Sequence, residues 1–212
     1  MARVKICGNT NLEDIELAAQ LGADYVGIIV DVPVDTPRNV DPEKAVTIFE
    51  ELPFTTAGVV VIMPQSIKEA LDLYIKLRPE FLQIHNNVEP KFIHEIKTNV
   101  PCNIIKTIHV EDEQSIKEAK RYQRWVDAIL LDTPSKTGGG SGKTLDWDIA
   151  REIVVSLDKP VILAGGLTPN NVAEAIEAVK PFAVDVSSGV ESQPGRKDPE
   201  KLERFIKIAK TL

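Results

Sequence analysis

The sequence contains few cysteine and histidine residues. Its two cysteines, Cys7 and Cys102, form neither a disulfide framework nor a CxxC metal pair, so we expect both thiols to be reduced. Its three histidines are dispersed along the chain and do not specify a metal site. The sequence therefore gives no indication of disulfide bonds or of a bound metal.

Long apolar runs and basic clusters are also absent from the sequence. No stretch approaches the roughly 18 apolar residues that a membrane span requires, and the chain begins with a β-rich run rather than a signal-peptide pattern. We therefore expect a cytoplasmic protein with no membrane partner. The net charge is −7 and Lys and Arg form no cluster, which argues against nucleic acid as a partner.

Strand and helix patterns alternate along the whole chain, in which 43% of the residues are hydrophobic. Helices begin at capping residues, for example at Asp41-Pro42, at Ser66 and at Asp198-Pro199. The expected strands are 3–7, 25–30, 57–62, 81–85, 103–108, 128–132, 160–164 and 183–187. The expected helices are 12–21, 41–52, 66–77, 91–97, 112–122, 146–156, one that opens at Thr168-Pro169, and 198–210.

This alternation gives eight β-α units of about 26 residues each, which predicts an α/β protein with the (β/α)8 TIM barrel fold. No linker or shift in composition interrupts the units, so we expect a single domain over residues 1–212. A doubly wound open sheet is the alternative, because its crossovers look alike locally. The count of eight favours the closed barrel.

A TIM barrel carries its chemistry in the loops that follow the strands. Polar or special residues occur at these positions: Cys7, His85, Asp132, Gly165-Gly166 and Ser187-Ser188-Gly189. Each also has a structural interpretation, since a lone cysteine is often buried as a small hydrophobe and an aspartate often caps a loop. His85 is itself typical of a structural histidine, and we expect His94 on a helix and His109 in a loop to take no part.

The glycine-rich loop after Asp132 has two alternative interpretations, a nucleotide-binding P-loop and a mobile loop without a function. Gly142-Lys143-Thr144 matches the end of a nucleotide-binding P-loop, but Thr137 stands where the first glycine is required and Asp132 lies too far upstream. The glycines after the seventh and eighth strands are better placed for an anion. Barrels often hold phosphate in these two loops on backbone N–H groups, so the sequence predicts a small phosphorylated substrate.

Seven motifs in order resemble the phosphoribosylanthranilate isomerase family of tryptophan biosynthesis over nearly the whole chain. They are VKICGNT (4–10), PRNV (37–40), LQIH (82–85), Leu131-Asp132, Gly139-Gly140-Ser141-Gly142 leading to Asp146-Trp147, LAGGL (163–167) and DVSSGVE (185–191). The sequence departs from the family in the second loop, which lacks the usual Phe-rich run, and at Asn86, which replaces a glycine.

The resemblance implies an Amadori rearrangement, in which one acid opens the ribose ring and one base removes the C2′ proton. By resemblance Asp132 is the acid, Cys7 is the base and Arg38 binds the anthranilate carboxylate. This assignment suits a desolvated carboxyl that keeps its proton and a thiol that nearby positive charge ionises. No metal or cofactor is expected. The other expected substrate-binding residues are His85, Gly140, Gly142, Gly165, Gly166, Asp185, Ser187, Ser188 and Gly189.

Two further expectations concern structure around the site. Lys5 shares a strand face with Cys7, so it would be buried and need a partner, for which we expect Asp185 on the neighbouring last strand. The loop 134–143 is expected to close over bound substrate.

Two other functions remain as alternatives. One is a barrel that binds a phosphorylated ligand without converting it. The other is the related sugar isomerase of histidine biosynthesis, whose family has Asp where Cys7 stands. The sequence leaves open whether the protein is a monomer or a homodimer.

Overall fold

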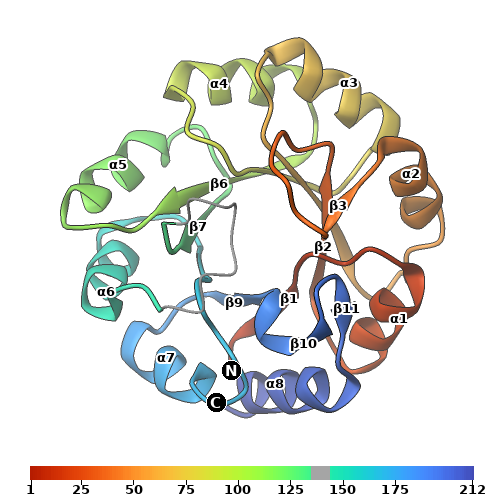
Figure 1. Ribbon diagram of the computed structural model, residues 1–212. Coiled ribbons are helices and arrows are strands. Elements are labelled where there is room, and N and C mark those ends of the chain that lie inside the picture. The colour runs from red at the N-terminus through yellow and green to blue at the C-terminus, as the bar shows by residue number, and fades with distance from the viewer. Residues whose placement is uncertain (135–143) are drawn as a thin grey trace.

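Parallel strands form a closed barrel with helices around it in the computed structural model, which describes residues 1–134 and 144–212 (Figure 1). The barrel closes because β1 pairs with β2 on one side and with β9 on the other, in parallel in both cases. The barrel strands are β1 (Arg3–Ile6), β2 (Tyr25–Val30), β4 (Ala57–Ile62), β5 (Phe81–Ile84), β6 (Asn103–His109), β7 (Ala128–Asp132), β8 (Val161–Leu163) and β9 (Ala183–Val186). The predicted (β/α)8 barrel is therefore confirmed, and the open-sheet alternative is wrong.

The outer helices follow the strands in the predicted order. They are α1 (Leu12–Gln20), α2 (Pro42–Glu50), α3 (Ile67–Leu77), α4 (Pro90–Asn99), α5 (Gln114–Tyr122), α6 (Trp147–Ser156), α7 (Val172–Val179) and α8 (Pro199–Thr211). Capping accounts for several starts, because the side chains of Asp41, Ser66 and Asp198 each accept a hydrogen bond from an N–H of the first turn. The seventh helix is present, but its predicted start at Thr168-Pro169 was wrong. Thr168 and the Asn171 side chain form a turn there, and the helix begins after it.

Four short elements were not predicted, and they lie at the mouth of the barrel. They are β3 (Asn39–Val40), the 3-10 helix η1 (Ser188–Val190) and the strands β10 (Glu191–Gln193) and β11 (Arg196–Lys197). The strand β3 extends the sheet beside β2, and β10 and β11 form an antiparallel hairpin. The hairpin and η1 follow β9 and therefore belong to the eighth βα loop.

Two layers of apolar side chains form the core. Because side chains alternate along a strand, one set points into the barrel and the other packs beneath the helices. The inner set contains Val59, Val61, Ile105, Ala128, Leu130, Ile162, Ala164 and Ala183, together with Cys7 at its upper end. Full burial of one such Val, Leu or Ile side chain stabilises the fold by about 1.5–3 kcal/mol. The interior is thus filled below Cys7.

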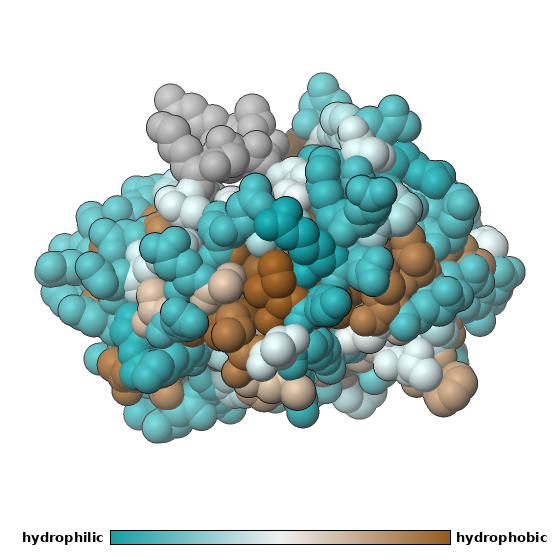
Figure 2. All heavy atoms as spheres, turned by 90° about the horizontal axis from the view of Figure 1, so that it is seen from below, coloured by the Kyte–Doolittle hydropathy of each residue, from teal (hydrophilic) through white to brown (hydrophobic). Residues whose placement is uncertain are grey.

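The two ends of the chain lie side by side next to α8 (Figure 1), where the N–H of Ala2 donates to the carbonyl of Ala209. Figure 2 shows one side of the molecule, on which hydrophilic residues cover most of the surface and hydrophobic residues show in patches between them. None of the described helices is long and apolar enough to cross a membrane.

Candidate active site

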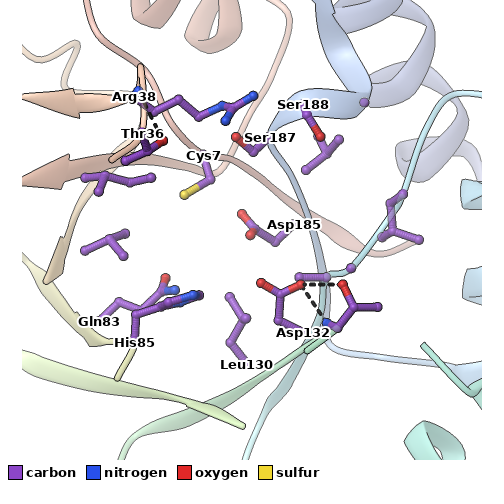
Figure 3. Close-up of a pocket in the computed structure, with 18 of the residues that line it drawn as sticks. Cys7, Thr36, Arg38, Gln83, His85, Leu130, Asp132, Asp185, Ser187 and Ser188 are labelled. Carbon is purple, nitrogen blue, oxygen red and sulfur yellow. Dashed lines mark hydrogen bonds between the residues drawn. The ribbon is translucent and has the colours of Figure 1, made fainter. Parts of the chain in front are cut away.

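A pocket opens at the carboxyl ends of the barrel strands and is shown in Figure 3. Its walls come from the first, second, third, fourth, sixth, seventh and eighth βα units and combine an apolar floor with polar groups. Among the sequence-predicted site residues, the pocket is lined by Cys7, Arg38, His85, Asp132, Gly165, Gly166, Asp185, Ser187, Ser188 and Gly189. Gly140 and Gly142 lie outside the described residues, as does the predicted closing loop apart from Pro134.

Asp132 ends strand β7 and points into the pocket opposite Cys7 (Figure 3). Burial raises the pKa of its carboxyl to about 6, and the hydrogen bond from the N–H of Thr133 to Oδ1, 2.8 Å long, partly opposes the shift. An aspartate of this kind keeps its proton more readily than a solvated one, which suits a proton donor. The direction agrees with the expectation from the sequence.

Cys7 follows strand β1 and is 6% exposed. Burial raises the pKa of its thiol above the ordinary value, although the ammonium of Lys5 acts in the opposite direction. The expectation that positive charge would make Cys7 a thiolate is therefore wrong for this structure. Desolvation outweighs the attraction of the cation, so the thiol is the resting form at neutral pH.

Lys5 is fully buried inside the barrel, and its Nζ donates to Oδ1 of Asp185 over 2.9 Å. Burial by itself would lower the pKa of Lys5, but Asp185 and Cys7 outweigh it, so the pKa lies above its usual value and the ammonium stays charged. The predicted pairing is confirmed. Gly27 leaves room for this cluster, since a Cβ there would come within 2.8 Å of the Cys7 Sγ and 3.0 Å of the Lys5 Nζ.

His85 follows strand β5, and its ring meets that of His109 edge to face at 5.2 Å between centroids. Burial lowers the pKa of His85 to about 3, with His109 and Lys106 acting in the same direction, so the ring is neutral at neutral pH. Its Nδ1 is buried and has no hydrogen-bond partner in the part of the chain that the structure describes. The expected loop position of His109 is wrong, because this residue ends strand β6 and supports His85.

Gln83 also lines the pocket, and the sequence analysis had not assigned it to the site. Its Nε2 donates to Oγ1 of Thr107 over 3.2 Å, whereas its Oε1 is buried without a partner among the described residues. The alternation of side chains along strand β5 could have identified it, because Gln83 lies two residues before His85 and shares its face. Each residue has a buried polar atom without a hydrogen-bond partner among the described residues, Oε1 of Gln83 and Nδ1 of His85.

The glycine-rich end of the pocket brings the seventh and eighth βα loops together. Gly165 and Gly166 have φ of +81° and +65°, values that residues other than glycine rarely adopt. At Gly189 a Cβ would lie 1.9 Å from the carbonyl oxygen of Leu167, so only glycine permits the contact between η1 and the turn. The Oγ of Ser187 is buried nearby, with no hydrogen-bond partner within the described ranges.

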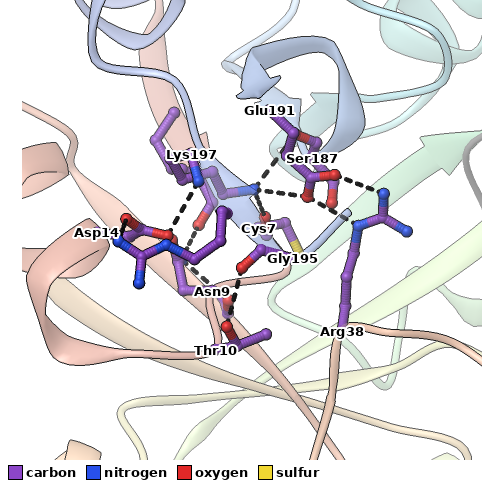
Figure 4. Close-up of polar contacts among 12 residues, drawn as sticks. Cys7, Asn9, Thr10, Asp14, Arg38, Ser187, Glu191, Gly195 and Lys197 are labelled. Atoms are coloured by element: carbon purple, nitrogen blue, oxygen red, sulfur yellow. Dashed lines mark hydrogen bonds and ion pairs between the residues drawn. The ribbon is translucent and has the colours of Figure 1, made fainter. Parts of the chain in front are cut away.

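Arg38 reaches the pocket from the second loop, and its guanidinium forms an ion pair with Glu191 of β10 (Figure 4). This contact raises the pKa of Arg38 further, and burial of Glu191 is outweighed by its cationic partners, so the pKa of that carboxyl is lowered. Lys197 of β11 completes the cluster with an Nζ that lies 3.3 Å from Oε1 of Glu191. Glu191 ended a recognised motif, but nothing in the local pattern identified its partners, which are distant in sequence.

The described residues contain no group of three or more His, Cys, Asp or Glu side chains placed to hold a metal ion. The site is instead an acid and a thiol on opposite walls, with a buried ammonium below them, a guanidinium at one end and a glycine-rich cradle at another. This set can transfer protons and bind anions.

Comparison with known proteins identifies the family. Residues 4–208 match the family model described as N-(5'-phosphoribosyl)anthranilate (PRA) isomerase. The N-(5'-phosphoribosyl)anthranilate isomerase of Methanocella arvoryzae is 48% identical over 207 residues, covering 97% of each chain.

Solved structures agree with this result. The phosphoribosyl anthranilate isomerase of Thermotoga maritima superimposes with a TM-score of 0.89 at 38% identity over 100% of both chains. Another, crystallised with reduced 1-(o-carboxyphenylamino)-1-deoxyribulose 5-phosphate, has a TM-score of 0.87 at 37% identity, also over 100% of both chains. The chain therefore belongs to the N-(5'-phosphoribosyl)anthranilate isomerase family.

Proposed function

We propose that Asp132 and Cys7 are the general acid and the general base of the rearrangement that this family catalyses. The chain is an isomerase of tryptophan biosynthesis that converts N-(5'-phosphoribosyl)anthranilate into 1-(2-carboxyphenylamino)-1-deoxyribulose 5-phosphate. The observation that carries the proposal is the placement of a carboxyl with a raised pKa and a thiol beside a buried ammonium on opposite walls of one pocket (Figure 3).

Asp132 acts in the first step. Its protonated carboxyl donates to the ring oxygen, the bond from that oxygen to C1′ breaks, and the anthranilate nitrogen supplies the electron pair that forms an iminium. A pKa of about 6 leaves roughly a tenth of this group protonated at pH 7, far more than an ordinary aspartate would provide. Burial therefore supplies the acid without help from another residue.

Cys7 acts in the second step. Its thiolate removes the C2′ proton, and the electrons of that C–H bond form the C1′–C2′ double bond of an enolamine, which tautomerises to the ketone. The ammonium of Lys5 below it stabilises the thiolate when it forms. Lys5 does not contact the substrate in this proposal and acts through Cys7.

The remaining pocket residues bind the substrate. At glycines 165, 166 and 189 no side chain blocks a phosphate from the backbone N–H groups. The first N–H groups of a helix, such as those of η1, have no partner within the helix and can bind an anion. Arg38 binds the anthranilate carboxylate, which a planar guanidinium suits. The unpartnered Oε1 of Gln83 can accept a hydrogen bond from a sugar hydroxyl, and the unpartnered Nδ1 of His85 can form one as acceptor or donor. The ligand is thus a small phosphorylated molecule.

Turnover by the purified chain tests the assignment, since the anthranilate group is fluorescent and its signal changes in the reaction. Asp132→Asn and Cys7→Ser should each lower kcat by about 10² to 10⁴ while the Kd of a product analogue stays nearly unchanged. Wild-type turnover by the Cys7→Ser variant would rule out Cys7 as the base.

A further inference from the structure

Glu191 connects its own loop to another loop, and the two approach each other only in the folded barrel. It is 8% exposed, and its carboxylate accepts from Nε of Arg38 at 2.8 Å through Oε1 and from Nη2 at 2.6 Å through Oε2. This two-point contact fixes the plane and the rotation of the guanidinium, which a single contact would not do. Arg38 belongs to the second βα loop and Glu191 to the eighth, and only β1 separates the strands that these loops follow, so the pair joins two loops on one side of the pocket mouth (Figure 4).

The contact determines which donors of Arg38 remain available. A guanidinium has five N–H groups, of which Glu191 occupies the one on Nε and one on Nη2. The two on Nη1 and the second on Nη2 form the free end, and Arg38 lines the pocket. A ligand carboxylate can therefore bind this end through two parallel hydrogen bonds.

Lys197 in turn holds Glu191. Its side chain is fully buried, and its Nζ donates to the carbonyl oxygens of Cys7 at 2.6 Å and Ser187 at 3.2 Å as well as to Oε1 of Glu191 at 3.3 Å. Two cations and one carboxylate leave the cluster with a net charge of +1 when Lys197 is protonated. An entering carboxylate thus meets excess positive charge in spite of Glu191.

We infer that Glu191 is a positioning residue that presents the free end of Arg38 to the pocket and thereby gives the site its preference for an aromatic amine that carries a carboxylate. This inference rests on the proposed function, because it takes Arg38 as the carboxylate-binding residue. It adds that the selectivity belongs to the pair and is lost when Glu191 no longer holds the guanidinium.

Two ligands and two variants test the inference. The ligands are reduced 1-(o-carboxyphenylamino)-1-deoxyribulose 5-phosphate and its phenylamino counterpart without the carboxyl group. In Glu191→Gln the ratio of the two Kd values should fall by about tenfold, with binding of the counterpart nearly unchanged. In turnover, KM should rise while kcat changes little.

Glu13→Gln is the matched control, because Glu13 pairs with Arg196 at 2.9 Å on the exposed side of the same hairpin. It should leave both Kd values unchanged. Glu191→Asp, with a shorter side chain, should keep the charge and the fold and give an intermediate ratio, so the inference stays testable if Glu191→Gln does not fold. In an Arg38→Met background, Glu191→Gln should cause no further loss of preference.

The outcomes separate this inference from the proposed function. Equal weakening of both ligands by Glu191→Gln, or an unchanged ratio, would mean that Glu191 only supports the hairpin, and the inference would be overturned. A wild-type protein that does not prefer the carboxylated ligand, or does not turn over the substrate, would instead contradict the proposed function itself.

Discussion

Asp132 and Cys7 titrate in an order that gives the pH profile of kcat a specific shape. Between pH about 6 and the higher pKa of the thiol, the pair holds one proton, mostly on Cys7. The reactive form also holds one proton, which lies on Asp132. The fraction of enzyme in this form is therefore constant within this pH range and decreases at lower and at higher pH. The wild-type profile should therefore have a plateau with an acidic limb near pH 6.

The two substitutions should move different limbs of that profile. In Asp132→Asn only the thiol titrates, so kcat should keep rising with pH up to the thiol pKa; in Cys7→Ser only the acid titrates, so kcat should fall above pH about 6. The measurement is kcat, because the free substrate has a phosphate that itself titrates at about pH 6. If Asp132→Asn and Cys7→Ser lost the same limb of the pH profile of kcat, the assigned roles would be contradicted.

The raised pKa of Asp132 also predicts an effect on stability. Its folded pKa of about 6 lies above the unfolded value of about 3.9, so the ionised carboxylate destabilises the fold as pH rises through this window and has no effect below it. Asn can still accept from the N–H of Thr133. At pH 7.5, Asp132→Asn should increase the free energy of unfolding by about 1–2 kcal/mol, allowing for partial solvation.

Urea denaturation at pH 7.5 and at pH 4 measures this difference. The gain should shrink towards zero at the lower pH, where both folded and unfolded wild-type chains carry a protonated Asp132. The same gain in the free energy of unfolding at both pH values would show that the buried carboxylate does not destabilise the fold when it is ionised. A site that is more stable without its acid would fit a residue retained for chemistry.

At the scale of elements, the contact between η1 and the turn after β8 shapes the proposed phosphate site. In Gly189→Ala the added Cβ would lie 1.9 Å from a backbone oxygen of Leu167, so η1 must move away from that turn. The N–H groups of the two loops would then no longer converge. We expect KM to rise by about tenfold or more, since one lost charged hydrogen bond already costs about 1.5–3 kcal/mol.

Gly22→Ala is a suitable control for this substitution. Gly22 has φ of +97° with no neighbour within 4 Å of the added Cβ, so alanine there meets backbone strain alone. Its expected effect is a loss of about 1 kcal/mol in the free energy of unfolding with KM unchanged. An unaltered KM in Gly189→Ala would show that the two loops do not jointly bind the phosphate.

Sequence patterns predicted the barrel strands and outer helices because each is long enough to show a period or a cap. The short elements β3, β10 and β11 have two or three residues and therefore no period. Their pairing depends on contacts between loops, such as that of Thr10 Oγ1 with the carbonyl of Gly195 at 2.9 Å. The pair formed by Arg38 and Glu191 was invisible for the same reason, as 153 positions separate the two residues.

The direction of a pKa shift was predictable only where one cause dominates. Asp132 ends an apolar run, so burial could be inferred from the sequence and raises its pKa. For Cys7, burial and the charge of Lys5 oppose each other, and their balance depends on distances that no pattern contains. The pairing of Lys5 with Asp185 was predictable because alternation and barrel closure are both rules of geometry.

At the scale of the whole molecule, the first and last strands of the barrel meet where the thiol of Cys7, the proposed base, is placed. In this seam β1 pairs with β9, with Lys5 in register with Asp185. The ion pair between their side chains lies inside the barrel at the floor of the pocket, which Asp185 lines. Closure of the fold and ionisation of Cys7 therefore depend on the same buried ammonium.

Lys5→Met tests both dependences in one protein. It leaves the Asp185 carboxylate largely buried without its cation, and breaking a buried pair in this way costs about 3–5 kcal/mol, so the urea midpoint should fall sharply. Removing the ammonium also takes away the charge that lowers the pKa of Cys7, so alkylation of Cys7 should require a higher pH than in the wild type.

Cys102 is the internal control for this measurement, because burial raises its thiol pKa to about 11 and the cation that acts against this shift is Lys97, not Lys5. Its alkylation profile, followed by peptide mass spectrometry in the same samples, should not change. Lys5→Met combined with Asp185→Leu removes both charges and should recover part of the lost stability, as a well-packed apolar pair can replace a buried ion pair. Recovery of stability with the Cys7 profile still shifted would separate the two roles of Lys5. An unshifted Cys7 profile in Lys5→Met would show that this ammonium holds the seam together and does not tune the base.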